Sequence, residues 1–119
     1  GKEMIVFISF EKAKVIQSRT MSDGPSHVTG YPKLTIFSDD SKIIEEFQFD
    51  VCYKISGWID RIDESTKIDR QKVAEEIAEI MIERFPIFDK LWLQDIIFKS
   101  ILFEVLKAYR VNREKEKEG

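Results

Sequence analysis

The spacing of hydrophobic and polar residues in the first half of the chain is that of β-strands. Residues 3–10, which read EMIVFISF, are almost continuously apolar and rich in β-branched and aromatic side chains, so they predict a buried strand. Glu11 and Lys12 interrupt the apolar run, and residues 13–19 resume a weaker alternation. We therefore expect a hairpin with its turn at this polar pair.

The clearest alternation in the chain lies in residues 47–55. Its apolar members are Phe47, Phe49, Val51, Tyr53 and Ile55, and its polar members are Gln48, Asp50, Cys52 and Lys54. This period of two predicts a strand with one buried face and one exposed face. Residues 33–38 form a further predicted strand, and the turn-forming residues 39–41 separate it from the next apolar run. The four strands together predict a mostly antiparallel sheet with a single covered face.

Helical spacing replaces strand spacing in the second half of the chain. Asp69 is a suitable N-cap residue, and apolar side chains follow it at helical intervals. Phe85-Pro86 predicts the end of this helix, because a proline disfavours helical geometry in the residue before it, and Pro86 can begin a second helix. We expect the second helix to run to about Arg110 and residues 111–119 to form a charged, frayed tail.

The predicted elements amount to one domain. A chain of 119 residues fits one hydrophobic core, whereas half of it would bury too little surface to fold alone. We expect a single α+β domain over residues 1–110, with the element order ββββαα. Its two C-terminal helices are expected to cover one face of the four-stranded, mostly antiparallel sheet.

The second predicted helix carries two apolar stripes when its residues are placed at about 100° per step. One stripe suits the sheet and consists of Phe88, Leu91, Phe98, Leu102, Val105, Leu106 and Tyr109. The other consists of Trp92, Ile96 and Phe103, with Leu93 at its edge. The first helix or a second copy of the chain can cover this other stripe. We favour a second copy, because the first helix must also cover the sheet and exposed aromatic residues promote aggregation.

Composition limits the cellular location and the kinds of metal site and cross-link that we expect. No apolar run is long enough to span a bilayer, and no secretory signal is present, so we expect a cytoplasmic protein with no membrane contact. Cys52 is the only cysteine and His27 the only histidine, which excludes a disulfide within the chain and a cysteine-cluster zinc site. Any metal site would have to consist mostly of carboxylates, and we expect none. A single asparagine, Asn112, among abundant Glu and Lys is typical of a thermophile.

Candidate catalytic residues are confined to residues 20–32, which we interpret as a long loop because they hold two prolines and two glycines. Asp23, Ser26 and His27 are weak candidates there, since long loops often carry function. The alternative, which we favour, is a surface loop composed of turn-forming residues. Neighbouring Ser26 and His27 do not by themselves show the geometry of a nucleophile and its base.

Other kinds of site find little support. No glycine-rich phosphate loop is present, so we expect no cofactor. The net charge is −3, and the basic residues that could contact nucleic acid are sparse, namely Lys12, Lys14, Arg19 and Lys33. This balance makes a nucleic-acid partner unlikely.

Three functions remain open, in order of preference. The first is a non-enzymatic protein-interaction, assembly or regulatory module that acts as a homodimer or higher oligomer through Trp92, Leu93, Ile96 and Phe103. The second is a small enzyme or ligand-binding domain with its site at residues 20–32. The third is a nucleic-acid-associated protein.

Overall fold

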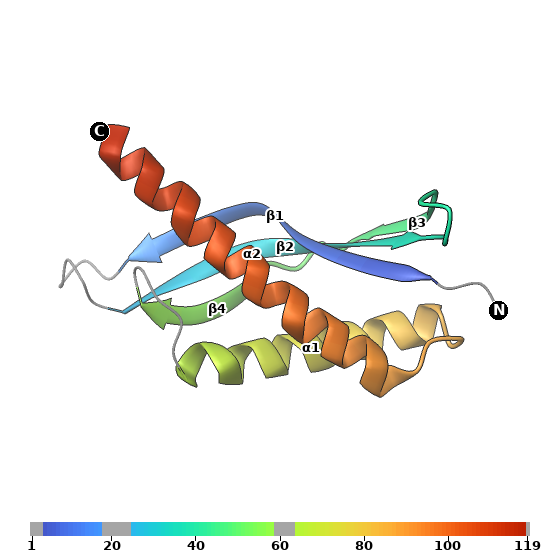
Figure 1. Cartoon of the computed structure of the whole chain (residues 1–119). Coiled ribbons are helices and arrows are strands. Elements are labelled where there is room, and N and C mark those ends of the chain that lie inside the picture. Colours follow the sequence, from blue (N-terminus) through green and yellow to red (C-terminus); the bar gives the residue numbers. More distant parts are fainter. Residues whose placement is uncertain (1–3, 18–24, 59–63, 119) are drawn as a thin grey trace.

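Four strands are followed by two helices in the computed structural model, which describes residues 4–17, 25–58 and 64–118 (Figure 1). The strands are β1 (Ile5–Gln17), β2 (Pro25–Phe37), β3 (Ile43–Gln48) and β4 (Tyr53–Trp58). The helices are α1 (Glu64–Arg84) and α2 (Lys90–Glu118). The predicted α+β class and the ββββαα order are confirmed.

The sheet is antiparallel and is built around β2. β1 pairs with one side of β2 along most of its length, from Ile5 opposite Phe37 to Gln17 opposite Ser26. The other side of β2 is shared, because β3 pairs with its C-terminal half and β4 with its N-terminal half. Among the described residues, β1 therefore has a partner on one side only.

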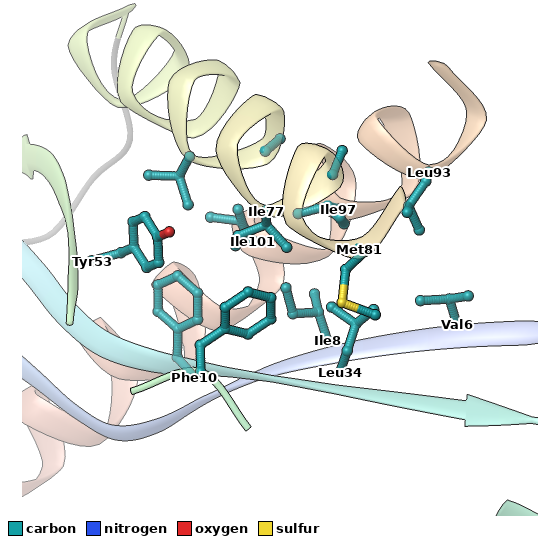
Figure 2. Packing of buried hydrophobic residues seen from close by; sticks show 14 of the residues in the cluster. Val6, Ile8, Phe10, Leu34, Tyr53, Ile77, Met81, Leu93, Ile97 and Ile101 are labelled. Atoms are coloured by element: carbon teal, nitrogen blue, oxygen red, sulfur yellow. The ribbon is translucent and has the colours of Figure 1, made fainter. Parts of the chain in front are cut away.

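Both helices cover the same face of the sheet (Figure 1). Side chains from this face and from the two helices form one buried cluster, part of which is shown in Figure 2. Its sheet members include Val6, Ile8, Phe10, Val28, Leu34, Ile36, Phe49, Tyr53 and Ile55. Its helix members include Val73, Ala74, Ile77, Ala78, Met81, Leu93, Ile97, Ile101, Val105 and Tyr109. The predicted single covered face is confirmed.

The two strands predicted over residues 3–10 and 13–19 are one continuous strand, β1, so the predicted hairpin is wrong. The polar pair is instead a β-bulge, where the register with β2 shifts between Glu11 and Lys14 and Lys12 has a φ of 55°. The strand is also buried on one face only, since Ile5 and Phe7 are about half exposed on the other.

Most of the predicted loop over residues 20–32 is strand as well, because β2 begins at Pro25; residues 18–24 lie outside the described part of the chain. Pro32 is tolerated there because it lies between the segments of β2 that pair with β4 and with β3. Its carbonyl still accepts a hydrogen bond from the Phe49 N–H at 2.9 Å. Gly30 is required by packing, since a Cβ at this position would lie 2.8 Å from that of Phe10.

The strand predicted over residues 47–55 is divided between β3 and β4. Its alternation is largely correct, since Phe49, Tyr53 and Ile55 are buried and the polar positions are exposed. Val51 is an exception and is 55% exposed. The reason is that the chain leaves one half of β2 and joins the other at this point.

The helix starts also differ from prediction. α1 begins at Glu64, five residues before the predicted cap Asp69. The Asp69 carboxylate instead accepts a hydrogen bond from the backbone N–H of Ser56 at 2.8 Å, and so attaches α1 to β4. α1 ends at Arg84, directly before Phe85-Pro86, as predicted.

α2 begins at Lys90 rather than at Pro86. Asp89 caps it, since its carboxylate accepts a hydrogen bond from the Trp92 N–H at 2.9 Å. The helix continues to Glu118, past the predicted end at Arg110, so residues 111–118 are helical where a frayed tail was expected.

Candidate functional site

The face of α2 that points away from the core carries large exposed apolar side chains. Phe103 is 70% exposed and Trp92 is 42% exposed, while Ile96 is half-buried against the core. These three residues belong to the predicted second stripe, and we call them the outer stripe of α2. Leu93, which was predicted at its edge, is fully buried and belongs to the core.

The stripe predicted to face the sheet was only partly correct. Leu91 and Leu106 are exposed, and the core-facing positions of α2 follow a strict spacing of four residues, namely Leu93, Ile97, Ile101, Val105 and Tyr109. That spacing is visible in the sequence and is the signal that could have identified the core.

α1 packs along a different side of α2 and leaves Phe103 uncovered. The guanidinium of Arg70 lies 4.1 Å from the centroid of the Phe98 ring and donates a hydrogen bond to the Phe98 carbonyl at 3.1 Å. At 100° per residue, Ile96 and Phe103 lie roughly 140° or more around the helix from Phe98. The alternative that α1 covers this stripe is therefore wrong for Phe103.

The outer stripe runs beside β1. Met4, at the start of β1, lines the same hollow as Trp92, whose ring stacks on that of Phe88 with centroids 6.1 Å apart. At the other end, the carboxylate of Glu104 accepts a hydrogen bond from the backbone of Phe10. β1 and α2 therefore run in the same general direction, as Figure 1 shows.

The outward side of β1 presents unpaired backbone groups. The N–H of Phe10 bonds to Glu104 on α2 and so points away from β2. In an antiparallel pair the backbone groups of alternate residues point to the same side. The N–H and C=O groups of Val6 and Ile8 thus also face outward, where no described strand pairs with them.

Glu104 is the one acidic side chain in the described core and is only 8% exposed. Burial is the largest influence on it and raises the pKa of its carboxyl above the ordinary value, and Glu11 adds to the increase. Lys107 and the hydrogen bond from Phe10 act in the opposite direction. The carboxylate therefore stabilises the β1 edge at Phe10 but is held in an unfavourable environment.

Two of the three weak catalytic candidates, Ser26 and His27, lie on opposite faces of the sheet. Ser26 is buried, and its hydroxyl lies 3.0 Å from the Tyr109 hydroxyl on the covered face. His27 is the next residue of β2 and faces the opposite side of the sheet, because successive strand side chains alternate. Burial and Lys54 lower the pKa of His27. Asp23 lies outside the described residues.

The uncovered face of the sheet collects some of the basic residues considered for nucleic acid. Lys12 lies with its Nζ 6.0 Å from the centroid of the Tyr31 ring, and Lys33 forms an ion pair with Glu46 at 3.8 Å. Lys14 is opposite Thr29 on this face, and Arg19 is outside the described residues. The basic side chains are thus mixed with acidic ones.

Within the described ranges, no three metal-ligating side chains converge, and neither helix is long and apolar enough to cross a membrane. The candidate site is therefore the outer stripe of α2 together with the neighbouring edge of β1. Comparisons with protein-family models, with curated proteins and with solved structures give no match to this chain.

Proposed function

We propose that this protein is a non-enzymatic interaction module that acts as a homodimer, with the outer stripe of α2 as part of the contact. The observation that carries the proposal is the 70% exposure of Phe103 on a side of α2 that α1 leaves uncovered. A phenylalanine and a tryptophan left in water on one helix face mark a surface that another molecule covers.

The outer stripe is complementary to a second copy of itself. Trp92 and Phe103 lie about 16 Å apart along the helix axis at 1.5 Å per residue. When two copies of α2 pack antiparallel about a point midway between these residues, Trp92 of each copy meets Phe103 of the other. Such a twofold arrangement closes on itself and leaves neither aromatic side chain exposed.

The area involved sets the strength of this contact. The exposed parts of Trp92 and Phe103 amount to about 450 Å² over two copies. At about 25 cal/mol per Å², burying them is worth about 11 kcal/mol, against an association cost of about 4–15 kcal/mol. A stable interface buries about 1,200–2,000 Å², so the dimer needs a contact beyond these two side chains.

The proposal places the protein in the cytoplasm. Its support is Cys52, which is exposed and is the only cysteine, as expected in a reducing compartment. A thermophilic origin is supported by the single asparagine among abundant charged residues.

Light scattering coupled to size exclusion tests the proposal. The wild-type chain should elute as a dimer at micromolar concentration, and Phe103→Glu should be a monomer with unchanged circular dichroism. Ile68→Glu, which changes a 64% exposed residue of α1, is the matched control and should remain a dimer. A wild-type monomer up to hundreds of micromolar, or a dimeric Phe103→Glu, would refute the proposal.

A further inference from the structure

We propose that two copies join edge to edge through β1, so that their sheets form one continuous sheet with a twofold axis beside Phe7. This inference rests on the proposed function and specifies how the dimer is built. The occupant of the β1 edge is then β1 of the second copy, in antiparallel orientation.

The edge of β1 is open only along its first part. The β-bulge between Glu11 and Lys14 interrupts regular pairing, and Glu104 holds the outward N–H of Phe10. Bulges and charged side chains of this kind normally protect an edge strand from pairing. Residues 5–9 have neither protection, and their outward backbone groups belong to Val6 and Ile8.

These backbone groups favour one register, because Val6 and Ile8 are the two outward-facing residues of β1 before Phe10. If Val6 pairs with Ile8 of the second copy, symmetry supplies the reverse pair, and about four backbone hydrogen bonds form. Phe7 then faces Phe7 of the second copy across the axis. A register centred on Ile8 would instead pair Val6 with Phe10, whose N–H is already bonded to Glu104.

The same axis also brings the outer stripes of α2 together. Met4 lines the same hollow as Trp92, and the backbone of Phe10 is hydrogen-bonded to Glu104. Phe7 lies midway between Met4 and Phe10 along the chain. It is therefore level with the middle of the stretch of α2 from Trp92 to Glu104. An axis beside Phe7 therefore places Trp92 of each copy against Phe103 of the other, as the proposed function requires.

Charge along α2 favours this orientation. Asp89 is exposed directly before α2, and Lys107 is exposed in its second half, on the same side of the helix as Phe103. Antiparallel packing about the same axis brings Lys107 toward Asp89 of the second copy. Parallel packing would leave Lys107 far from Asp89 of the second copy.

Pairing of the two β1 strands also brings apolar side chains together on the uncovered face of the sheet. Phe7 is 51% exposed and Ile5 is 55% exposed on this face. Across the axis, the two copies of Phe7 form a cross-strand aromatic pair, which is among the stabilising pairs of antiparallel sheets. Ile5 of each copy then lies opposite Ser9 of the other.

A cysteine cross-link tests the register. In a Cys52→Ser background, which removes the only cysteine, Phe7→Cys places one thiol on each side of the axis. In an antiparallel sheet, two directly opposed residues that share no backbone hydrogen bond have Cα atoms about 4.5 Å apart, within the range of a disulfide. Mild oxidation should therefore convert most of the Phe7→Cys protein to a covalent dimer on a non-reducing gel.

Ile5→Cys in the same background is the matched control, because it lies on the same strand and face and is equally exposed. In the proposed register two copies of residue 5 are about 13 Å apart, so they cannot form a disulfide. Phe7→Cys should cross-link roughly tenfold more than Ile5→Cys. A mixture of Ile5→Cys and Ser9→Cys should yield the covalent heterodimer.

The outcomes separate the two proposals. If light scattering shows a dimer but Phe7→Cys does not cross-link, or Ile5→Cys cross-links as well, then pairing through β1 in this register is refuted and the proposed function stands. If the wild-type chain is a monomer, both proposals fail and a different protein covers the stripe. Thermal melting of each cysteine variant, compared with the Cys52→Ser parent, verifies that the fold is retained.

Discussion

Gly30→Ala tests the part of the fold that differs most from the sequence prediction, namely the continuous strand β2. The backbone of Gly30 does not have positive φ, so alanine is permitted there and would by itself gain about 0.5–1 kcal/mol from reduced freedom of the unfolded chain. Packing opposes this gain. A Cβ would lie 2.8 Å from Cβ and 2.9 Å from Cδ2 of Phe10, closer than van der Waals contact allows.

Phe10 has little room to move away. It is buried in the core, and its backbone N–H is bonded to Glu104. Overpacking in such a position costs about 1–3 kcal/mol, so the free energy of unfolding should fall by about 0.5–2 kcal/mol after the gain from the unfolded chain is subtracted. For a chain of this length the melting temperature should fall by about 2–8 °C.

Urea unfolding followed by circular dichroism measures this change, and a double-mutant cycle assigns its cause. Phe10→Ala removes Cγ and Cδ2, two of the three atoms that the new methyl group would meet, so Gly30→Ala should be less harmful in that background than in the wild type. A coupling energy above about 0.5 kcal/mol would show that the two residues interact. If Gly30→Ala stabilises the protein, or if the two changes are additive, the close contact between β1 and β2 at this point is wrong.

Two further predictions concern pH and heat. The pKa of the Glu104 carboxyl in the folded protein is raised above its ordinary value of 4.5. As the pH rises, this carboxyl therefore loses its proton in the unfolded chain before it does so in the folded protein. The free energy of unfolding consequently falls between pH 4.5 and the pKa of the folded protein. Urea titrations at several pH values should therefore show Glu104→Gln gaining stability relative to wild type between pH 4 and neutrality, whereas parallel curves would contradict the raised pKa. If the chain comes from a thermophile, calorimetry should give a melting temperature above about 65 °C, the upper end of the range for mesophilic domains, and a lower value would count against that origin.

Local patterns were sufficient to predict the class of the fold. The alternation in residues 47–55 predicted the covered face correctly for Phe49, Tyr53 and Ile55, on both sides of the break between β3 and β4. It failed for Val51, which lies at the break itself. The helix end before Pro86 was correct for a similar reason, since a proline acts on its immediate neighbour.

The strand boundaries could not be predicted because they depend on residues far apart in sequence. Gly30 and Pro32 have the composition of a loop, yet one is required by Phe10 and the other lies where β2 changes partner from β4 to β3. The polar pair that suggested a turn is a bulge, because β2 is long enough to pair on both sides of it.

The candidate site was partly visible in the sequence. Helical spacing placed Trp92, Ile96 and Phe103 on one stripe, and two of them are exposed in the structure. That the stripe needs its own cover remains a prediction. The relation of that stripe to β1 could not be predicted, because residues 3–10 have the composition of a strand buried on both faces. Only the topology shows that one side of this strand is an edge and that Ile5 and Phe7 are exposed.

One part of the β1 edge is protected against pairing and the other is not. This contrast supports the use of the open part as a dimer contact. A monomeric protein with an edge strand of this length should protect all of it, since an open edge invites pairing with other chains. Here the bulge and Glu104 protect the edge from Phe10 onward, although burying that carboxylate raises its pKa and weakens the fold at neutral pH. The open part coincides with exposed Ile5 and Phe7, and Met4 directly before it lines the same hollow as Trp92. The edge of β1 is thus protected from Phe10 onward, and residues 5–9 before it are open and mostly apolar. This combination restricts pairing to one register. A defined dimer requires such a restriction, whereas unspecific aggregation does not.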